Sequence, residues 1–316
     1  MRIGIVANYD LSCLNKQSEC PNWAYKGVHF VTDSLDNLDG LVIFNAPSKA
    51  ISVSLHRNMI LKVNQEPYLP QVYKWQKGKN HGGFALHGWW NGKYNQSLSN
   101  CILPWHVSYN LQELRELAPK KDKLISCIAS TKAHFPGHKK RLVAIEHLKG
   151  QSDIDIDFFG KGTNFIPRKE QGLERYFFSV AIENTHDTGF WTEKITDCVL
   201  CDTIPIHFGS ELPDEVFPEG SYIKLPDLQP DTLRNVLSEL DEDLYCSMLP
   251  QLQVAKRNIL ERHHAFPQLA KFFKERKPEG HPTRTSFSEH LYLKQRIEKW
   301  RHSVSVFPSA LRRFRR

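Results

Sequence analysis

The 316-residue sequence lacks long hydrophobic runs, internal repeats and a regular cysteine framework. Its apolar runs, such as residues 41–44, are strand-sized and far shorter than the roughly 18 residues that a membrane-spanning helix needs. The seven cysteines are odd in number and irregularly spaced, which is typical of reduced thiols. The apolar run before Asn8 is too short for the core of a signal peptide. These features predict a cytoplasmic protein that does not cross a bilayer.

Positive charge is in excess only at the C-terminal end. Residues 294–316 contain eight basic residues and one acidic residue, which accounts for the whole net charge of +7. Since a nucleic-acid-binding protein spreads its positive charge over a folded face, nucleic acid is not an expected partner. The tail leaves two interpretations open: a solubilising end, or peripheral attachment to an anionic membrane surface. The arginines that would make that attachment are Arg312, Arg313, Arg315 and Arg316.

The length and composition predict two globular domains. At roughly 150 residues per domain, 316 residues allow two cores, and a mean hydropathy of −0.47 with 40% hydrophobic residues is ordinary for a soluble fold. A proline and three lysines between residues 117 and 123 mark the expected boundary. The predicted parts are an N-terminal domain at 1–118, a C-terminal domain at 119–285, and a helix with a basic tail at 286–316.

Short apolar segments predict buried strands in both domains. In the second domain they alternate with helices, which is typical of βαβ units with a parallel sheet. Further helices are expected at residues 232–240 and 287–302. The predicted strands lie at residues 2–7, 41–44, 60–63, 101–103, 124–129, 154–159, 177–182 and 203–208, and the helices between them at 138–149 and 193–201.

The segment at residues 177–210 carries the clearest functional pattern. After an apolar strand and a loop, Thr192 is placed to cap a helix that begins at Glu193. In a right-handed βαβ unit, the carboxyl end of the strand and the start of the next helix share one edge of the sheet. The helix dipole and Lys194 favour an anion there, so a diphosphate is the expected ligand. The side chains that should converge are Glu183, Asn184, Glu193 and Lys194.

This segment resembles the signature of the α1,3/α1,4-fucosyltransferases, glycosyltransferase family 10. In that family an apolar strand ends in Phe-Glu-Asn, Tyr-Val-Thr-Glu-Lys opens a helix, and Val-Pro-Val precedes a small-residue turn. The counterparts here are residues 182–184, residues 190–194 (Phe-Trp-Thr-Glu-Lys) and residues 204–206 with the turn at 209–210. A weaker resemblance covers about residues 120–280. The resemblance implies the α/β GT-B fold, in which two Rossmann-like domains with parallel sheets face each other across a cleft. It also implies that the domain at 1–118 binds the acceptor and the domain at 119–285 binds the nucleotide sugar.

The resemblance also implies an activity and the residues that serve it. A family member transfers fucose from GDP-fucose to a hydroxyl of a glycan or oligosaccharide. Phe190 and Trp191 replace the tyrosine and valine of the signature, so a contact that needs the tyrosine hydroxyl is lost. Another nucleotide-sugar donor, or a non-catalytic carbohydrate-binding protein, stays open as an alternative. The donor-binding residues implied by the resemblance are Arg141 and Lys194 for the diphosphate, Glu193 for ribose or sugar hydroxyls, and Glu183 and Asn184 as pocket lining. Lys161, between two glycines, is a further candidate phosphate contact.

Inverting transfer also needs a carboxylate that takes the proton of the acceptor hydroxyl. Glu66 follows the apolar run at residues 59–63, at the expected carboxyl end of a strand, and Pro67 fixes the turn after it. It resembles the glutamate-containing segment of the family, and is therefore the candidate catalytic residue. Because Arg141 and Lys194 can stabilise the leaving diphosphate by charge-assisted hydrogen bonds, no metal or other cofactor is expected.

Three other patterns are given structural interpretations. The alternation of Asp153, Asp155 and Asp157 resembles an Asp-x-Asp metal motif but suits a strand. Cys198 and Cys201 lie within a predicted helix and are interpreted as buried thiols. The glycine- and aromatic-rich segment at residues 82–94 is expected to be a loop that either packs or forms a wall of the acceptor site.

Overall fold

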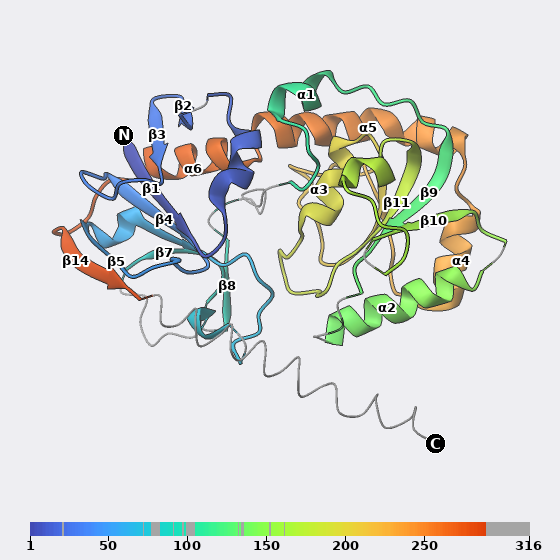
Figure 1. Cartoon of the computed structure of the whole chain (residues 1–316), viewed down its shortest axis with the longest axis horizontal. Helices are drawn as coiled ribbons and strands as arrows, with labels where there is room; N and C mark the ends of the chain where they lie inside the picture. Colours follow the sequence, from blue (N-terminus) through green and yellow to red (C-terminus); the bar gives the residue numbers. More distant parts are fainter. Residues whose placement is uncertain are drawn as a thin grey trace. The chain divides into compact units, whose positions relative to one another are not determined.

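The computed structural model describes residues 1–20, 22–71, 73–76, 83–90, 92–96, 98, 105–131, 133, 136–151, 153–160 and 162–288. The chain divides into two compact units, residues 1–99 with the chain from Leu269 onward, and residues 100–268 (Figure 1). Each unit is an α/β fold with a mostly parallel sheet, which confirms the predicted fold class. That the two sheets face each other across a cleft stays a prediction.

The first unit is built on a seven-stranded sheet in the order β2-β3-β1-β4-β6-β7-β8. The five central strands are parallel, and β2 and β8 pair antiparallel with their neighbours at the two edges. Because β4 is buried along its whole length, its sequence is continuously apolar. The strands are β1 (Arg2–Ala7), β2 (Ala24–Tyr25), β3 (Val28–Val31), β4 (Gly40–Phe44), β6 (Ile60–Val63), β7 (Ala85–Trp90) and β8 (Lys93–Asn95).

The second unit has a five-stranded, wholly parallel sheet in the order β10-β9-β11-β12-β13. From β9 the chain passes to one side, to β10, and later crosses to β11 on the other side. The carboxyl ends of β9 and β11 therefore form a topological switch point, where open α/β sheets bind ligands. The strands are β9 (Lys123–Ile128), β10 (Ile156–Phe159), β11 (Tyr176–Ile182), β12 (Ile204–Phe208) and β13 (Ile223–Lys224); the helices are α1 (Leu111–Glu116), α2 (Pro136–Lys149), α3 (Glu193–Leu200), α4 (Pro230–Ser238), α5 (Glu242–Glu261) and α6 (Ala265–Lys274).

The units differ from the predicted domains at their boundaries. Buried apolar side chains at residues 105–114 belong to the core of the second unit, so that unit begins before residue 118. The chain leaves it at Leu269, within α6, and not at residue 285. Strand β14 (Thr283–Phe287) then pairs antiparallel with β5 (Ile51–Leu55) of the first unit. Phe287 thus ends a strand where a helix is predicted to begin, and residues 289–302 lie outside the described residues.

The predicted strands at residues 2–7 and 60–63 coincide with β1 and β6, and those predicted in the second unit match β9 to β12 within two residues. The strand predicted at residues 101–103 lies outside the described residues. The loop expected at residues 82–94 contains strands β7 and β8 instead. Trp89 and Tyr94 lie opposite each other on these strands, with ring centroids 5.7 Å apart, so the aromatic residues stabilise a hairpin.

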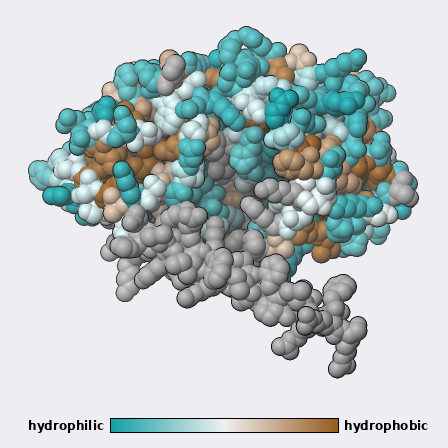
Figure 2. Space-filling view, viewed as in Figure 1, coloured by the Kyte–Doolittle hydropathy of each residue, from teal (hydrophilic) through white to brown (hydrophobic). Residues whose placement is uncertain are grey.

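The surface shown in Figure 2 is mainly hydrophilic, with separate hydrophobic areas. Among the described residues, Val143 and Phe165 are large apolar side chains that are more than half exposed. No described helix has both the length and the apolar character needed to cross a bilayer. The described cysteines are free thiols, and Cys198 and Cys201 are buried as expected. The arginines of the tail lie outside the described residues, so their proposed membrane contact stays a prediction.

Candidate functional site

A cavity of about 340 Å³ opens at the switch point of the second unit. Apolar side chains from the ends of β9 and β11, among them Ile128 and Ile182, form part of its wall. The start of α3 lies on the same side of the sheet, because α3 follows β11. Its charged and histidine lining residues are His106, Arg141, Lys169, Glu193 and Lys194.

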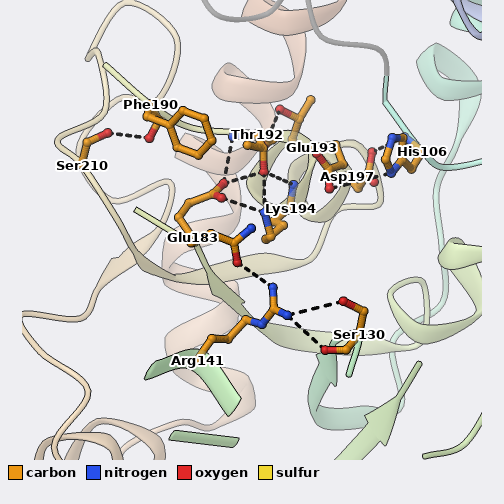
Figure 3. Close-up of polar contacts among 12 residues, drawn as sticks. His106, Ser130, Arg141, Glu183, Phe190, Thr192, Glu193, Lys194, Asp197 and Ser210 are labelled. Carbon is orange, nitrogen blue, oxygen red and sulfur yellow. Dashed lines mark hydrogen bonds and ion pairs between the residues drawn. The ribbon is translucent and has the colours of Figure 1, made fainter. Parts of the chain in front are cut away.

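Arg141 is hydrogen-bonded to the segments that follow the two strands of the switch point, β9 and β11. Its guanidinium, carried by α2, donates to Asn184 Oδ1 at 2.7 Å after β11 and to the Ser130 carbonyl at 3.0 Å after β9 (Figure 3). The residue is only 5% exposed, and burial lowers the pKa of Arg141 below its ordinary value. A guanidinium nevertheless stays protonated in proteins. Arg141 therefore places a fixed positive charge in the cavity wall.

A glycine determines how closely α2 approaches the end of β11. A Cβ atom at Gly137 would lie 1.6 Å from the carbonyl oxygen of Asn184, so no other residue type fits without a backbone shift. Gly160, which lines the cavity after β10, has a φ of +128°, and a Cβ there would lie 1.8 Å from the Ala129 carbonyl oxygen. These close approaches determine where Arg141 and the cavity wall lie.

Glu183 is a buried carboxylate with both oxygens occupied. Its Oε1 accepts from the backbone N–H and the hydroxyl of Thr192 at 2.8 and 2.6 Å, and its Oε2 accepts from Lys194 Nζ at 2.7 Å (Figure 3). Lys194 Nζ also donates to the Thr192 hydroxyl at 2.9 Å. Thr192 is the N-cap of α3, as predicted. Glu183 therefore closes the loop between β11 and α3 and holds the ammonium group of Lys194.

Glu193 and Lys194 begin α3 and line the cavity, as predicted. Burial opposes the ionisation of Glu193, but the positive charges of Lys194, Lys169 and His106 outweigh it and bring the pKa of Glu193 to about 2. His106 Nδ1 lies 3.8 Å from Glu193 Oε1. An ionised carboxylate at this position accepts hydrogen bonds, for example from sugar hydroxyls.

Lys169, Asp197 and His106 complete the site and are absent from the sequence-based predictions. Lys169 Nζ lies 2.6 Å from Asp197 Oδ2 and donates to the Glu193 carbonyl at 3.3 Å. Asp197 is fully buried, and its Oδ1 accepts from the His106 backbone N–H at 2.9 Å. Burial acts to lower the pKa of Lys169, but Asp197 and Glu193 raise it above its ordinary value. Of these three residues, only Asp197 could have been inferred from the nearby sequence, since it lies one helical turn after Glu193.

Glu183 and Asn184 differ from their predicted role as pocket lining. Among the described residues, neither contributes to the cavity wall; Glu183 holds Lys194, and Asn184 holds Arg141. Lys161 lies outside the described residues, so its contact with phosphate stays a prediction.

Glu66 follows β6 in the first unit, as predicted, and is half-buried. Its Oε2 accepts from the hydroxyl of Tyr73 at 2.7 Å. The backbone around it is held by two side-chain amides: Asn64 Nδ2 donates to the Glu66 carbonyl at 2.9 Å, and Gln76 Nε2 donates to the Pro67 carbonyl at 2.7 Å. The carboxylate thus stands on a loop that hydrogen bonds fix on several sides.

The aspartates that resemble a metal motif have structural partners. Asp157 lies in β10 and accepts from Lys123 Nζ and from the Tyr176 hydroxyl, and Asp153 pairs with Arg234. Among the described residues, no group of three or more histidine, cysteine, aspartate or glutamate side chains is arranged to hold a metal ion. Asp157 thus lies in a strand, as predicted, whereas Asp153 and Asp155 precede β10.

Three cationic side chains, Arg141, Lys169 and Lys194, line one cavity at the carboxyl ends of parallel strands and beside the start of a helix. An α/β unit with this arrangement is suited to bind an anionic group such as the diphosphate of a nucleotide. Residues 118–249 match the family model described as glycosyltransferase family 10 (fucosyltransferase), C-terminal. The predicted resemblance is confirmed: the second unit carries a family 10 glycosyltransferase domain.

Similar proteins include an α-(1,3)-fucosyltransferase, FucT, of Helicobacter pylori, which is 34% identical over 64 residues. That match covers 20% of this chain and 13% of the relative. Solved structures that resemble the chain include an α1,3-fucosyltransferase with GDP, at a TM-score of 0.49 and 18% identity over 87% of this chain and 89% of the other. Another is a DNA-modifying β-glucosyltransferase, at a TM-score of 0.46 and 10% identity over 87% of this chain and 98% of the other.

Phe190 and Trp191, which replace the tyrosine and valine of the family signature, both have defined contacts. Trp191 is 2% exposed and packs edge-on against Phe217, with ring centroids 5.0 Å apart, so the larger side chain fills the core. The carbonyl of Phe190 accepts from the Ser210 hydroxyl at 2.6 Å, which joins the loop before α3 to the turn after β12. The loop is therefore anchored through its backbone at the position where the family has a tyrosine.

Proposed function

We propose that the protein is an inverting glycosyltransferase that transfers fucose from GDP-fucose to a hydroxyl of a glycan acceptor. The proposal depends on the three cations that line the cavity of the unit matching family 10. The family description supports fucose as the transferred sugar. The name of the H. pylori relative favours an α1,3 linkage.

In this proposal the donor diphosphate lies against the start of α3. Arg141 donates hydrogen bonds to it, and Lys169 and Lys194 contribute positive charge. Negative charge grows on the diphosphate as the sugar leaves, and cations that are already in place stabilise that charge without rearranging. Because these side chains neutralise the leaving group, the proposed reaction uses no metal. The ionised Glu193 accepts hydrogen bonds from hydroxyls of the donor.

Glu66 is the proposed general base. The acceptor oxygen forms a bond to the anomeric carbon on the face opposite the diphosphate, and the bond from that carbon to the diphosphate oxygen breaks. The proton of the acceptor hydroxyl passes to the Glu66 carboxylate, and GDP leaves with the electron pair. Attack from the opposite face inverts the anomeric configuration.

Binding of GDP, UDP and CMP to the full chain, measured by calorimetry, tests the donor site. We expect GDP to bind, and Arg141→Gln to weaken its binding at least tenfold, because a charge-assisted hydrogen bond is lost. Arg141 suits this test since Asn184 and Ser130, to which it donates, offer neutral oxygens, whereas Lys194 and Lys169 each contact a buried carboxylate. The exposed Arg175→Gln serves as control.

Turnover with GDP-fucose and a panel of oligosaccharides then tests the reaction. Equal GDP affinity of wild type and Arg141→Gln would contradict the donor site. Preference for UDP or CMP would instead support a different nucleotide-sugar donor on the same fold. Glycan binding without consumption of any donor would support a non-catalytic carbohydrate-binding protein.

A further inference from the structure

We propose that Tyr73 is the positioning residue of the acceptor half: its hydroxyl holds one carboxylate oxygen of Glu66 and leaves the other to take the acceptor's proton. This inference rests on the proposed function, in which Glu66 is the general base. It adds a second residue to the proton transfer and assigns different tasks to the two oxygens of Glu66.

The two oxygens of Glu66 have different surroundings. Oε2 accepts from the Tyr73 hydroxyl at 2.7 Å, whereas no residue in the described part of the chain donates to Oε1. Tyr73 is 2% exposed, and burial together with the charge of Glu66 raises the pKa of Tyr73 far above its ordinary value. Its hydroxyl therefore stays protonated and remains a donor at any pH at which the protein is folded.

Tyr73 itself is held in place. Its backbone N–H donates to the Leu69 carbonyl at 2.8 Å, and its ring lies 4.9 Å from the ring of Trp75. The indole N–H of Trp75 donates in turn to Asn64 Oδ1 at 3.1 Å. Since neither the backbone nor the ring is free to follow a rotating carboxylate, the hydroxyl favours one orientation of Glu66.

The loop that carries Glu66 is equally fixed. Gln76 has no exposed surface, and its Nε2 donates to Asn64 Oδ1 at 3.3 Å and to the Pro67 carbonyl at 2.7 Å. Its Oε1 accepts from the Leu69 backbone N–H at 2.7 Å. Two buried amides thus join the segment after β6 to the turn that contains Tyr73. Such a network supplies the rigidity that a surface loop ordinarily lacks.

The arrangement determines how the proton is received. In transfer, the proton leaves the acceptor oxygen as that oxygen bonds to the anomeric carbon, and it forms an O–H bond with Oε1 of Glu66. The Tyr73 hydroxyl keeps its own proton and continues to donate to Oε2. After product release the proton on Oε1 returns to solvent. Tyr73 therefore affects the chemical step and leaves GDP binding, which takes place in the second unit, unchanged.

A double-mutant cycle tests the inference: wild type, Tyr73→Phe, Glu66→Gln and the variant with both changes. We expect Tyr73→Phe to lower kcat about ten- to hundredfold, the range for a hydrogen bond to a charged group. The affinity for GDP should stay within twofold of wild type, and the acidic limb of the kcat–pH profile should move to higher pH. In the Glu66→Gln background, the second change should cost less than twofold.

Tyr245→Phe is the matched control, because Tyr245 is also buried and its hydroxyl donates to the Asp202 carbonyl at 3.0 Å in the second unit. It should leave kcat within twofold of wild type. If Tyr73→Phe unfolds at a lower temperature than Tyr245→Phe, replacement of Tyr73 by 3,5-difluorotyrosine provides the second variant. This residue keeps the ring and the hydroxyl but donates more strongly, so the acidic limb should move in the opposite direction, to lower pH.

The failures of the two proposals are distinguishable. Wild-type kcat and an unchanged pH profile in Tyr73→Phe, with a slow Glu66→Gln, would overturn only the role of Tyr73. If Tyr73→Phe lowered kcat by the same factor in wild type and in Glu66→Gln, Tyr73 would act through general stability. This result would also overturn the proposed role of Tyr73. Normal turnover of Glu66→Gln would remove Glu66 from the reaction and with it the proposed mechanism.

Discussion

Two glutamates at the ends of parallel strands, Glu183 after β11 and Glu66 after β6, have opposite surroundings. Glu183 is fully buried, and its oxygens accept two hydrogen bonds from Thr192 and one from Lys194. Glu66 is half-buried, and among the described residues its carboxylate accepts one hydrogen bond, from the Tyr73 hydroxyl. A glutamate just after a parallel strand is therefore a structural carboxylate in one unit and an accessible one in the other.

The difference shows what decides the role of a carboxylate at a sheet edge. A carboxylate with both oxygens occupied orders the chain around it, since displacing any partner leaves a buried polar group unpaired. A carboxylate with an oxygen to which no described residue donates a hydrogen bond can accept a proton from a ligand. The number of local donors, which the sequence pattern around the glutamate does not reveal, separates these roles.

The largest expected effect is on stability, from the change Glu183→Gln. The amide leaves the partly buried ammonium of Lys194 without its counter-charge, and breaking a buried ion pair typically costs about 3–5 kcal/mol. Glu66→Gln keeps an oxygen for the Tyr73 hydroxyl and should cost less than about 1 kcal/mol. Urea unfolding of both variants measures the contrast. Equal losses of unfolding free energy would show that the two carboxylates are equally structural.

The next effect is acid sensitivity from Glu193. Its pKa is about 2 in the folded protein, against 4.5 for an unperturbed glutamate, so between these values the unfolded chain binds more protons. The stabilisation is therefore complete above pH 4.5 and is lost as the pH falls towards 2. It amounts to about 3 kcal/mol. Unfolding free energies of wild type and Glu193→Gln between pH 6 and pH 2.5 should converge by about that amount; parallel curves would contradict the assigned pKa.

Local patterns explain what could be predicted from the sequence. Strands β1, β6, β11 and β12 are largely buried in parallel sheets, so their sequences are short apolar runs with clear ends. The cap at Thr192 is a local contact, in which its side chain accepts from the Lys194 backbone N–H at the start of α3. The strand-to-helix unit that forms the edge of the cavity could therefore be predicted before its geometry was known.

The remaining features depend on contacts between distant segments. Lys169 and His106 reach the cavity from segments without a motif, and Tyr73 finds Glu66 only because the chain turns back on itself. Glycines at residues 82–92 indicated a loop, although this segment forms a hairpin whose stability depends on cross-strand aromatic contacts. Such pairings leave no periodic signal within one segment.

A smaller effect, limited to the donor half, is expected from Gly137→Ala. The added methyl group would meet the Asn184 carbonyl, so α2 must move and carry Arg141 away from the switch point. We expect GDP affinity to fall about tenfold, because the charge-assisted hydrogen bond from Arg141 is weakened. Gly150→Ala, just after the same helix, is the control, because its nearest atoms lie 3.5 Å away. Similar GDP affinities of the two variants would show that α2 does not determine the donor site.

The smallest effect is expected from Phe190→Tyr, which restores the tyrosine of the family signature. The Ser210 hydroxyl anchors this segment through the Phe190 carbonyl, and the half-buried ring is not needed for that contact. The added hydroxyl should therefore change the KM for GDP-fucose no more than about fivefold, the effect of one hydrogen bond in a loop that is already ordered. A tenfold or larger change would mean that the ring, and not the backbone, sets the loop before α3. A side-chain contact would then position the donor-binding loop, as Tyr73 is proposed to position Glu66. The two units would differ only in which residues make the positioning contact.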